Sequence, residues 1–196
     1  DVIVYDAECH ACIIDGLRLH QGHRFVFKHN EIDDCDKQLQ RATALIEKQN
    51  AGGILLITEG VFGMAGDQGK LKEIAALRPK YSFRMLVDDA HGFGLLGEGR
   101  GALVEYALHH PRVVYMATLG KAAGVAGAFV AGSRQLIDWL VNRARTYIFT
   151  TAHPPAQAAA VLASLQLIEQ ESWRRLLLQE HISALRAALM ETSFRL

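Results

Sequence analysis

Four polar side chains that follow two apolar runs are the residues of this sequence best suited to chemistry. Asp88 and His91 come after one apolar run, and Thr118 and Lys121 come after another run further along the chain. Parallel strands present functional side chains at their carboxyl ends. We therefore expect an acid, an imidazole, a hydroxyl and an amine to meet at one edge of a sheet.

This set of groups suits a pyridoxal phosphate site. Such a cofactor needs an amine that binds it covalently, and Lys121 supplies one. A carboxylate keeps the pyridine nitrogen protonated, so that the ring accepts electrons, and Asp88 fits that need. His91 fits a donor to the ring hydroxyl, and Thr118 fits a phosphate contact. A single strand-end Asp often only caps the next segment, so the prediction rests on the combination.

Two other chemistries match parts of the same motifs. Asp88, Asp89 and His91 resemble a divalent-metal site, but neighbouring strand residues point to opposite faces, so we do not expect the two carboxylates to share an ion. Gly120-Lys121 resembles a phosphate-binding loop, but the Walker pattern needs glycine five residues earlier, where Tyr115 stands. Neither alternative accounts for the whole set.

Apolar runs of strand length alternate with segments of helical periodicity along the chain. The continuous run 53–58 is typical of a strand that is buried on both faces. Strands are predicted over 2–6, 24–28, 53–58, 85–87, 113–117 and 128–131, and helices over 11–19, from the turn at 29–34 to about 49, and over 68–77, 135–145, 156–169 and 173–190. The apolar positions of the last two helices are predicted to pack on the domain or at a subunit contact. Cys35, Trp139 and Trp173 are predicted to be packing residues.

The composition limits the classes of protein and partner. The chain of 196 residues is long enough for one domain with a sizeable core. Lys plus Arg number 21 and Asp plus Glu number 21, so we expect no nucleic-acid or anionic-lipid partner. No apolar run reaches the roughly 20 residues of a membrane span. Three cysteines do not suggest a secreted disulfide framework, and no targeting peptide opens the chain, so we expect a cytoplasmic protein.

Five motifs give the sequence a resemblance to a known family. It resembles the α-oxoamine synthases, pyridoxal phosphate enzymes that join an amino acid to an acyl thioester with loss of carbon dioxide. Further motifs at 128–133 and 154–157 most resemble the biotin-pathway branch of that family. The motifs that carry the main resemblance are Asp6-x-x-x-His10-Ala11, Thr58-Glu-Gly-Val-Phe-x-Met64, Val87-Asp-Asp-Ala-His-Gly92, Thr118-Leu-Gly-Lys121 and Phe149-Thr-Thr-x-x-Pro-Pro155.

The resemblance implies a fold, a domain and partners. The fold is the large domain of the fold-type I pyridoxal phosphate enzymes, a three-layer α/β/α sandwich around a mostly parallel sheet. Residues 1–196 are expected to be the central part of that domain, without the family's N-terminal segment and C-terminal small domain, and residues 194–196 to enter another strand. The implied substrates are L-alanine and a pimeloyl thioester carried by coenzyme A or an acyl carrier protein, in a homodimer with a shared active site.

The resemblance also assigns roles. Lys121 binds the cofactor and removes the α-proton, Asp88 holds the ring nitrogen protonated, and His91 steadies the ring oxygen. His10, which by itself reads as a polar loop residue between two helix-packed cysteines, stacks on the ring in the family.

Phosphate contacts complete the implied site. Thr118 reaches the phosphate within the subunit, and Thr150 and Thr151 reach the phosphate of the neighbouring subunit. Without the resemblance, these two threonines are equally well explained as capping residues.

Two positions depart from the family pattern. Gly63 stands where serine is usual, and Ala65 where aspartate is common. The serine hydroxyl usually lies near the cofactor ring hydroxyl, so we predict weaker polarisation or a compensating water. Glu59, at the end of a predicted strand, is expected to be either catalytic or a structural carboxylate.

Other functions stay open at this point. A sister synthase that uses glycine, or an aminotransferase, would keep the site and change the reaction. A catalytically impaired module would keep the fold and the cofactor or the oligomeric contact, and lose the reaction.

Overall fold

A single six-stranded sheet organises the protein in the computed structural model, which describes residues 1–50 and 52–192. The strand order is β2-β1-β3-β4-β5-β6. Neighbouring strands are parallel from β2 to β5, and only β6 is antiparallel, to β5. The strands are β1 (Val2–Asp6), β2 (His23–Phe27), β3 (Ile54–Glu59), β4 (Phe83–Asp88), β5 (Val113–Thr118) and β6 (Ala128–Ala131). The predicted mostly parallel sheet is confirmed.

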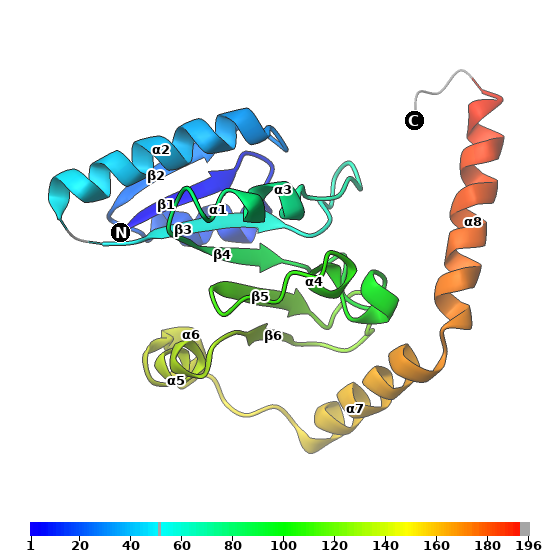
Figure 1. Cartoon of the computed structure of the whole chain (residues 1–196). Coiled ribbons are helices and arrows are strands. Elements are labelled where there is room, and N and C mark those ends of the chain that lie inside the picture. The colour runs from blue at the N-terminus through cyan, green and yellow to red at the C-terminus, as the bar shows by residue number, and fades with distance from the viewer. Residues whose placement is uncertain (51, 193–196) are drawn as a thin grey trace.

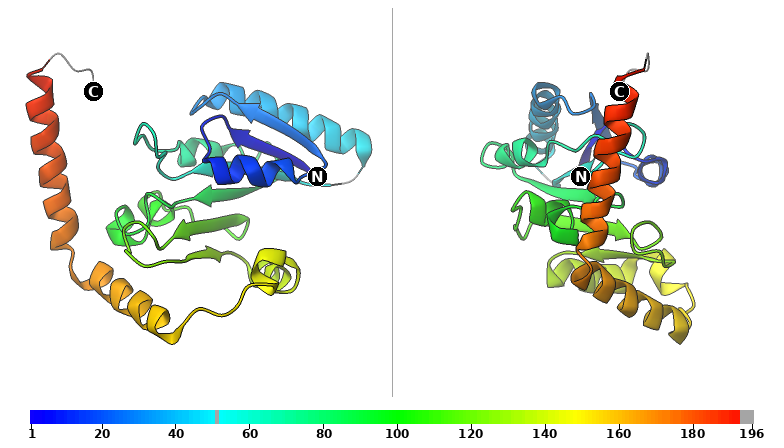
Figure 2. Two further views of the ribbon diagram at one scale, coloured as in Figure 1. Left: turned by 180° about the vertical axis from the view of Figure 1, so that it is seen from behind. Right: turned by 90° about the vertical axis from the view of Figure 1, so that its right-hand side faces the viewer.

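Helices cover both faces of this sheet and make three layers (Figures 1 and 2). Alternate strand residues such as Val4 and Leu56 point into the larger core under α2, α3 and α4. Their neighbours, such as Ile3 and Ile57, point into a smaller core under α1. These helices are α1 (Ala11–Arg18), α2 (Ile32–Gln49), α3 (Leu71–Ala76) and α4 (Ala102–Glu105), with a short 3-10 helix η1 (Gly97–Gly99) before α4.

The α1 face is only partly covered. Between α1 and α5 lies a groove of about 690 Å³ at the amino ends of the strands, and Ile3, Leu86, Val114 and Leu136 are among its lining residues. The remaining helices are α5 (Arg134–Arg143), α6 (Arg145–Ile148), α7 (Pro155–Gln170) and α8 (Trp173–Met190).

None of the described residues of α5 to α8 is buried. Helix α8 stands away from the sheet in both figures. Trp139 is 61% exposed and Trp173 is 53% exposed, so the predicted packing of these two side chains is not found within the described chain. Whether these apolar positions meet a subunit contact stays a prediction, and the strand predicted at 194–196 lies outside the described residues.

Within residues 1–50 and 52–192, no helix combines the length and apolar character of a membrane crossing.

Candidate active site

The carboxyl ends of β3, β4 and β5 bring most of the predicted residues to one edge of the sheet. Glu59 ends β3 and pairs in register with Asp88 at the end of β4. Thr118 ends β5, and Lys121 follows in the turn before β6. Strand alternation places Glu59, Asp88 and Thr118 on the α1 face. The parallel register therefore positions an acid, a second acid and a hydroxyl side by side.

His91 and Lys121 meet across this edge. The Lys121 Nζ and the His91 Nε2 are 2.6 Å apart. Burial lowers the pKa of His91, the positive charges of Lys121 and His10 lower it further, and only Asp88 opposes them. A neutral imidazole can accept a hydrogen bond at Nε2 from the lysine ammonium. The predicted partners are thus in contact, and Asp88 and His10 are close enough to affect the pKa of His91.

Asp88 and Asp89 are adjacent and buried but do different work. Asp89 Oδ2 accepts hydrogen bonds from the Ala102 N–H at 2.7 Å and from the Tyr115 hydroxyl at 2.7 Å. Asp88 Oδ1 accepts one bond, from the Ala90 N–H at 3.0 Å. No described residue bonds to its other oxygen. Asp89 holds the loop after β4 in place, while Asp88 keeps an oxygen for another donor.

Divalent metal is not favoured by this arrangement. Asp89 Oδ2 accepts the two structural hydrogen bonds. Asp89 Oδ1 is packed against Gly60 and Gly92, where a Cβ on either glycine would lie 2.1 Å from it, so neither oxygen is open to an ion. Among the described residues, no group of three or more His, Cys, Asp or Glu side chains is arranged to hold a metal ion.

Glu59 is a site residue whose role the sequence left open. It is 4% exposed, and its Oε1 accepts a hydrogen bond from the His10 N–H at 2.5 Å. Burial raises the pKa of Glu59 to about 7, with a further contribution from the negative charge of Asp88. Glu59 therefore fixes the start of α1 and can change its proton state near neutral pH.

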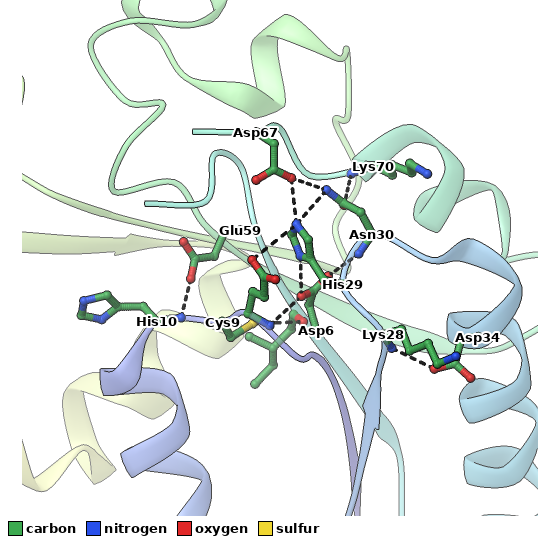
Figure 3. A network of polar contacts seen from close by, with 12 residues as sticks. Asp6, Cys9, His10, Lys28, His29, Asn30, Asp34, Glu59, Asp67 and Lys70 are labelled. Atoms are coloured by element: carbon green, nitrogen blue, oxygen red, sulfur yellow. Dashed lines mark hydrogen bonds and ion pairs between the residues drawn. The ribbon is translucent and has the colours of Figure 1, made fainter. Parts of the chain in front are cut away.

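His10 caps helix α1 at the same edge. Its Nδ1 accepts a hydrogen bond from the Cys12 N–H at 3.2 Å, which satisfies one of the free donors of the first turn. The ring is exposed and points away from Glu59 (Figure 3). Of the two flanking cysteines, Cys9 is buried as predicted, whereas Cys12 is exposed. His10 presents a free aromatic face, and its stacking role stays a prediction.

The three threonines separate into two groups. Thr118 Oγ1 donates to the Gly127 carbonyl at 3.1 Å and accepts from the Gly120 N–H at 3.3 Å, so it shapes the turn that carries Lys121. Thr150 and Thr151 are exposed between α6 and α7, and Thr150 donates to the Thr146 carbonyl. In the described chain these two residues make no contact with Lys121, and their role in a neighbouring subunit stays a prediction.

Gly63 lies directly against His91. A Cβ on Gly63 would come within 2.6 Å of His91 Nε2, which is closer than such atoms approach. Any larger residue therefore requires the imidazole or the loop to shift, and Nε2 is the atom that contacts Lys121. The departure at Gly63 therefore lies where it borders His91, whereas Ala65 is exposed in the same loop.

The geometry fits the predicted cofactor. An exposed lysine amine contacts an imidazole, and a buried carboxylate keeps one oxygen without a described partner. A pyridinium ring offers an N–H to that carboxylate and an aldehyde carbon to the amine. The donor set is therefore the one that a pyridoxal phosphate needs.

Comparison with known proteins agrees with this geometry. The sequence model of the family "Aminotransferase class I and II" matches residues 1–196. A cysteate-C-fatty acyltransferase of Capnocytophaga ochracea is 45% identical over 197 residues, with 100% of this chain and 47% of the relative covered. An 8-amino-7-oxononanoate synthase of Delftia acidovorans is 48% identical over 194 residues, covering 96% and 46%. The chain spans about half the length of the curated relatives that it matches.

Solved structures give the same answer for the fold. A serine palmitoyltransferase of Sphingomonas wittichii superposes with a TM-score of 0.90 at 31% identity, covering 100% of this chain and 48% of that one. An 8-amino-7-oxononanoate synthase of Francisella tularensis gives 0.79 at 30% identity, covering 100% and 55%. This chain belongs to the aminotransferase class I and II family, in its α-oxoamine synthase group. The predicted fold-type I architecture is confirmed.

Proposed function

We propose that the protein containing this chain is a pyridoxal phosphate-dependent acyltransferase that condenses an amino acid with an acyl thioester and releases carbon dioxide. The contact between Lys121 and His91 beside the half-free carboxylate of Asp88 is the observation that carries the proposal. The relatives named above, which are acyltransferases and a synthase, support the same reaction class.

Three residues hold the cofactor in this proposal. Lys121 binds it covalently, Asp88 holds a proton on the ring nitrogen, and Thr118 places the turn beside the phosphate. When bound, the cofactor supplies an electron sink for bond changes at the α-carbon of the amino acid. Burial of Asp88 at 3% exposure keeps water from competing for that proton.

Proton handling falls to Lys121 and His91. After it is displaced by the amino acid, the Lys121 amine is the base that takes the α-proton. His91 stays neutral because burial and the neighbouring positive charges lower its pKa. It orients the Lys121 amine through Nε2 and, after accepting a proton there, would pass that proton to the acyl oxygen. His10 stacks over the ring and restricts the geometry of the reacting atoms.

We further propose a homodimer with a shared active site in the cytoplasm. Thr150 and Thr151 lie in an exposed segment away from Lys121, as expected for residues that serve the phosphate of the other subunit. The exposed apolar side chains of α7 and α8 supply a surface for the contact.

The substrates that we propose are L-alanine and a pimeloyl thioester, which give 8-amino-7-oxononanoate, the product named in several relatives. A second candidate is cysteate with a fatty acyl thioester, which the name of the 45% identical Capnocytophaga ochracea relative favours.

Product analysis separates these candidates. The full-length protein is incubated with alanine, cysteate, glycine or serine, each with pimeloyl or palmitoyl coenzyme A, and the products are identified by mass spectrometry. The proposal requires a condensation product with the mass of the acyl thioester plus the amino acid, less one carbon dioxide and one free thiol. It also requires turnover with alanine and pimeloyl coenzyme A above the other pairs. Transamination alone, or no turnover by the cofactor-loaded protein, would contradict it.

A further inference from the structure

A second polar cluster lies on the opposite face of the sheet from Glu59 and Asp88. Asp6, at the end of β1, is fully buried, and strand alternation directs it to the α2 face. His29 follows β2 and bonds to it through Nδ1 at 2.9 Å. The other ring nitrogen of His29 bonds to Asp67 Oδ2 at 2.8 Å, in the loop after β3 (Figure 3). One imidazole thus joins two segments that are far apart in the sequence.

The two bonds together require a charged ring. Ionised carboxylate oxygens only accept hydrogen bonds, so both nitrogens of His29 must donate, which only an imidazolium can do. Partial burial opposes the charge, but hydrogen bonds to Asp6 and Asp67 outweigh burial and raise the pKa of His29. A third acid, Glu8 in the turn after β1, lies 3.7 Å from Nε2.

The other neighbours of the ring are uncharged. The Asn30 Nδ2 bonds to the same Asp67 oxygen at 2.7 Å, and the Phe62 ring meets His29 edge-on with centroids 4.4 Å apart. All described ionisable groups that face the ring, from β1, the turn after it and the loop after β3, are therefore acids.

The cluster supplies most of the polar contacts that attach the loop over residues 60–69 to the rest of the domain. Inside residues 60–69, Phe62 N–H donates to the Asp67 carbonyl and Gly66 N–H donates to the Phe62 carbonyl. These bonds fold the loop on itself and do not attach it to the sheet. At its start, Gly60 N–H donates to the Asp88 carbonyl at 2.8 Å. The Phe62 side chain is 1% exposed and anchors the loop by apolar burial. The polar contacts that attach the loop further along come mainly from His29 and Asn30, with one more from the Tyr106 hydroxyl to Gln68.

The same loop borders the candidate active site. Phe62 and Asp67 contact His29, and Gly63 lies against His91, which contacts Lys121. A shift of the loop therefore changes the space available to His91.

We propose that His29 is a positioning residue: as an imidazolium bonded to Asp6 and Asp67, it fixes the loop over residues 60–69 where Gly63 borders His91, and its deprotonation loosens that loop. A raised folded-state pKa means that the stabilisation is fully present below the unfolded value of about 6.5 and is lost as the pH rises through the folded value. The inference concerns loop position and rests on the proposed function only for its effect on turnover.

Hydrogen exchange in the full-length protein tests the fastening. Exchange of peptides that cover residues 60–69 is measured from pH 6 to pH 9, after correction for intrinsic rates, in wild type, His29→Gln, Asp67→Asn and the control His23→Gln. His23 is exposed at the start of β2, the strand that His29 follows, and its side chain has no hydrogen-bond partner among the described residues. Wild type and the control should lose about tenfold in protection as the pH rises, the size expected for a charge-assisted hydrogen bond.

His29→Gln and Asp67→Asn should exchange quickly at every pH. Asp67→Asn keeps the hydrogen bond between Asp6 and His29. Its loop exchange can therefore be measured even if His29→Gln does not fold. Equal protection of the loop in either variant and in the control across the pH range would overturn the inference.

A second readout tests the connection to the active site. The His91 imidazole is titrated by NMR in cofactor-free full-length protein, where we expect a shift of its pKa towards the ordinary value in both variants and no shift in His23→Gln. A loosened loop with an unchanged His91 titration would contradict the positioning role. Both measurements work without turnover, so a protein that shows them and condenses no amino acid would refute the proposed function and leave this inference standing.

Discussion

The sheet with its first four helices and the C-terminal helices are stabilised in different ways. Residues 1–131 contain every described residue of the two hydrophobic cores and the buried acids of the carboxyl edge. Helices α5 to α8 bury none of their described residues, and Trp173, Leu176 and Leu185 are each more than half exposed. A region that buries its own apolar surface can hold catalytic groups in place by itself. The helical region buries no described apolar side chain, and α7 is linked to the sheet region by polar contacts such as that from the Ser164 hydroxyl to the Ala123 carbonyl.

The largest effect should follow from core truncation in the sheet region. Phe83 is 1% exposed, so Phe83→Ala should lower the free energy of unfolding by about 3–5 kcal/mol. Leu176, on α8, is 64% exposed, and Leu176→Ala should change it by no more than about 0.5 kcal/mol within one chain. Urea unfolding at several protein concentrations measures both. Equal losses, independent of concentration, would remove the distinction between the regions.

Asp88 and Asp89, at the edge of the sheet, should contribute differently: Asp88 to catalysis and Asp89 to stability. Asp88→Asn should reduce kcat/KM by about 10²–10³-fold, as expected for removal of one preorganised electrostatic contact, with little loss of stability. Asp89→Asn should instead lower the free energy of unfolding by about 1–3 kcal/mol, because it disturbs the bonds to Ala102 and Tyr115. Steady-state kinetics and thermal unfolding of the two variants decide the question, and the reverse pattern would show that their roles are exchanged.

Glu59 should make the sheet region sensitive to pH. Its folded-state pKa of about 7 lies above the ordinary value, so folding takes up a proton between the two. The stabilisation is present below the unfolded value of about 4.3 and is lost as the pH rises through 7. Glu59→Gln should remove this part of the slope of stability against pH between 5 and 8. Unfolding of both proteins across that range measures it, and parallel slopes would contradict the assignment.

A smaller effect is expected at Gly63. In Gly63→Ser the new Cβ pushes the His91 ring away from Lys121, and the neighbouring charge then lowers the imidazole pKa less. We expect a rise in the pKa of His91 and a change in kcat of no more than about tenfold, since one hydrogen bond is exchanged for another. NMR titration of His91 checks the shift, and Ala65→Ser, at an exposed position of the same loop, is the matched control. A pKa that stays the same in both would refute the contact.

The sequence predicted this edge of the sheet because its signals are local. Apolar runs that end in Asp88 and Thr118 define strands and their carboxyl ends without knowledge of distant residues. The same reasoning started the helix at 68, whereas α3 begins at Leu71 because Gln68 pairs with Val61 in the loop.

The clusters that the sequence missed join segments far apart in the chain. His29 was interpreted as a turn residue, and only folding brings Asp6 and Asp67 to its two nitrogens. The signal in the sequence is a histidine-asparagine pair directly after a strand, with one acid at the end of the preceding strand and another in a glycine-rich loop. Glu59 likewise needed the start of α1 beside it to have a defined role.

The central claim is that Lys121 binds pyridoxal phosphate while Asp88 holds its ring nitrogen protonated. The direct test is borohydride reduction of the full-length protein, followed by visible spectroscopy and peptide mapping, with Lys121→Arg as the control. The account predicts a visible band that reduction abolishes and a label found on Lys121 alone. A label on any other residue, or a visible band in Lys121→Arg that reduction abolishes in the same way, would contradict it.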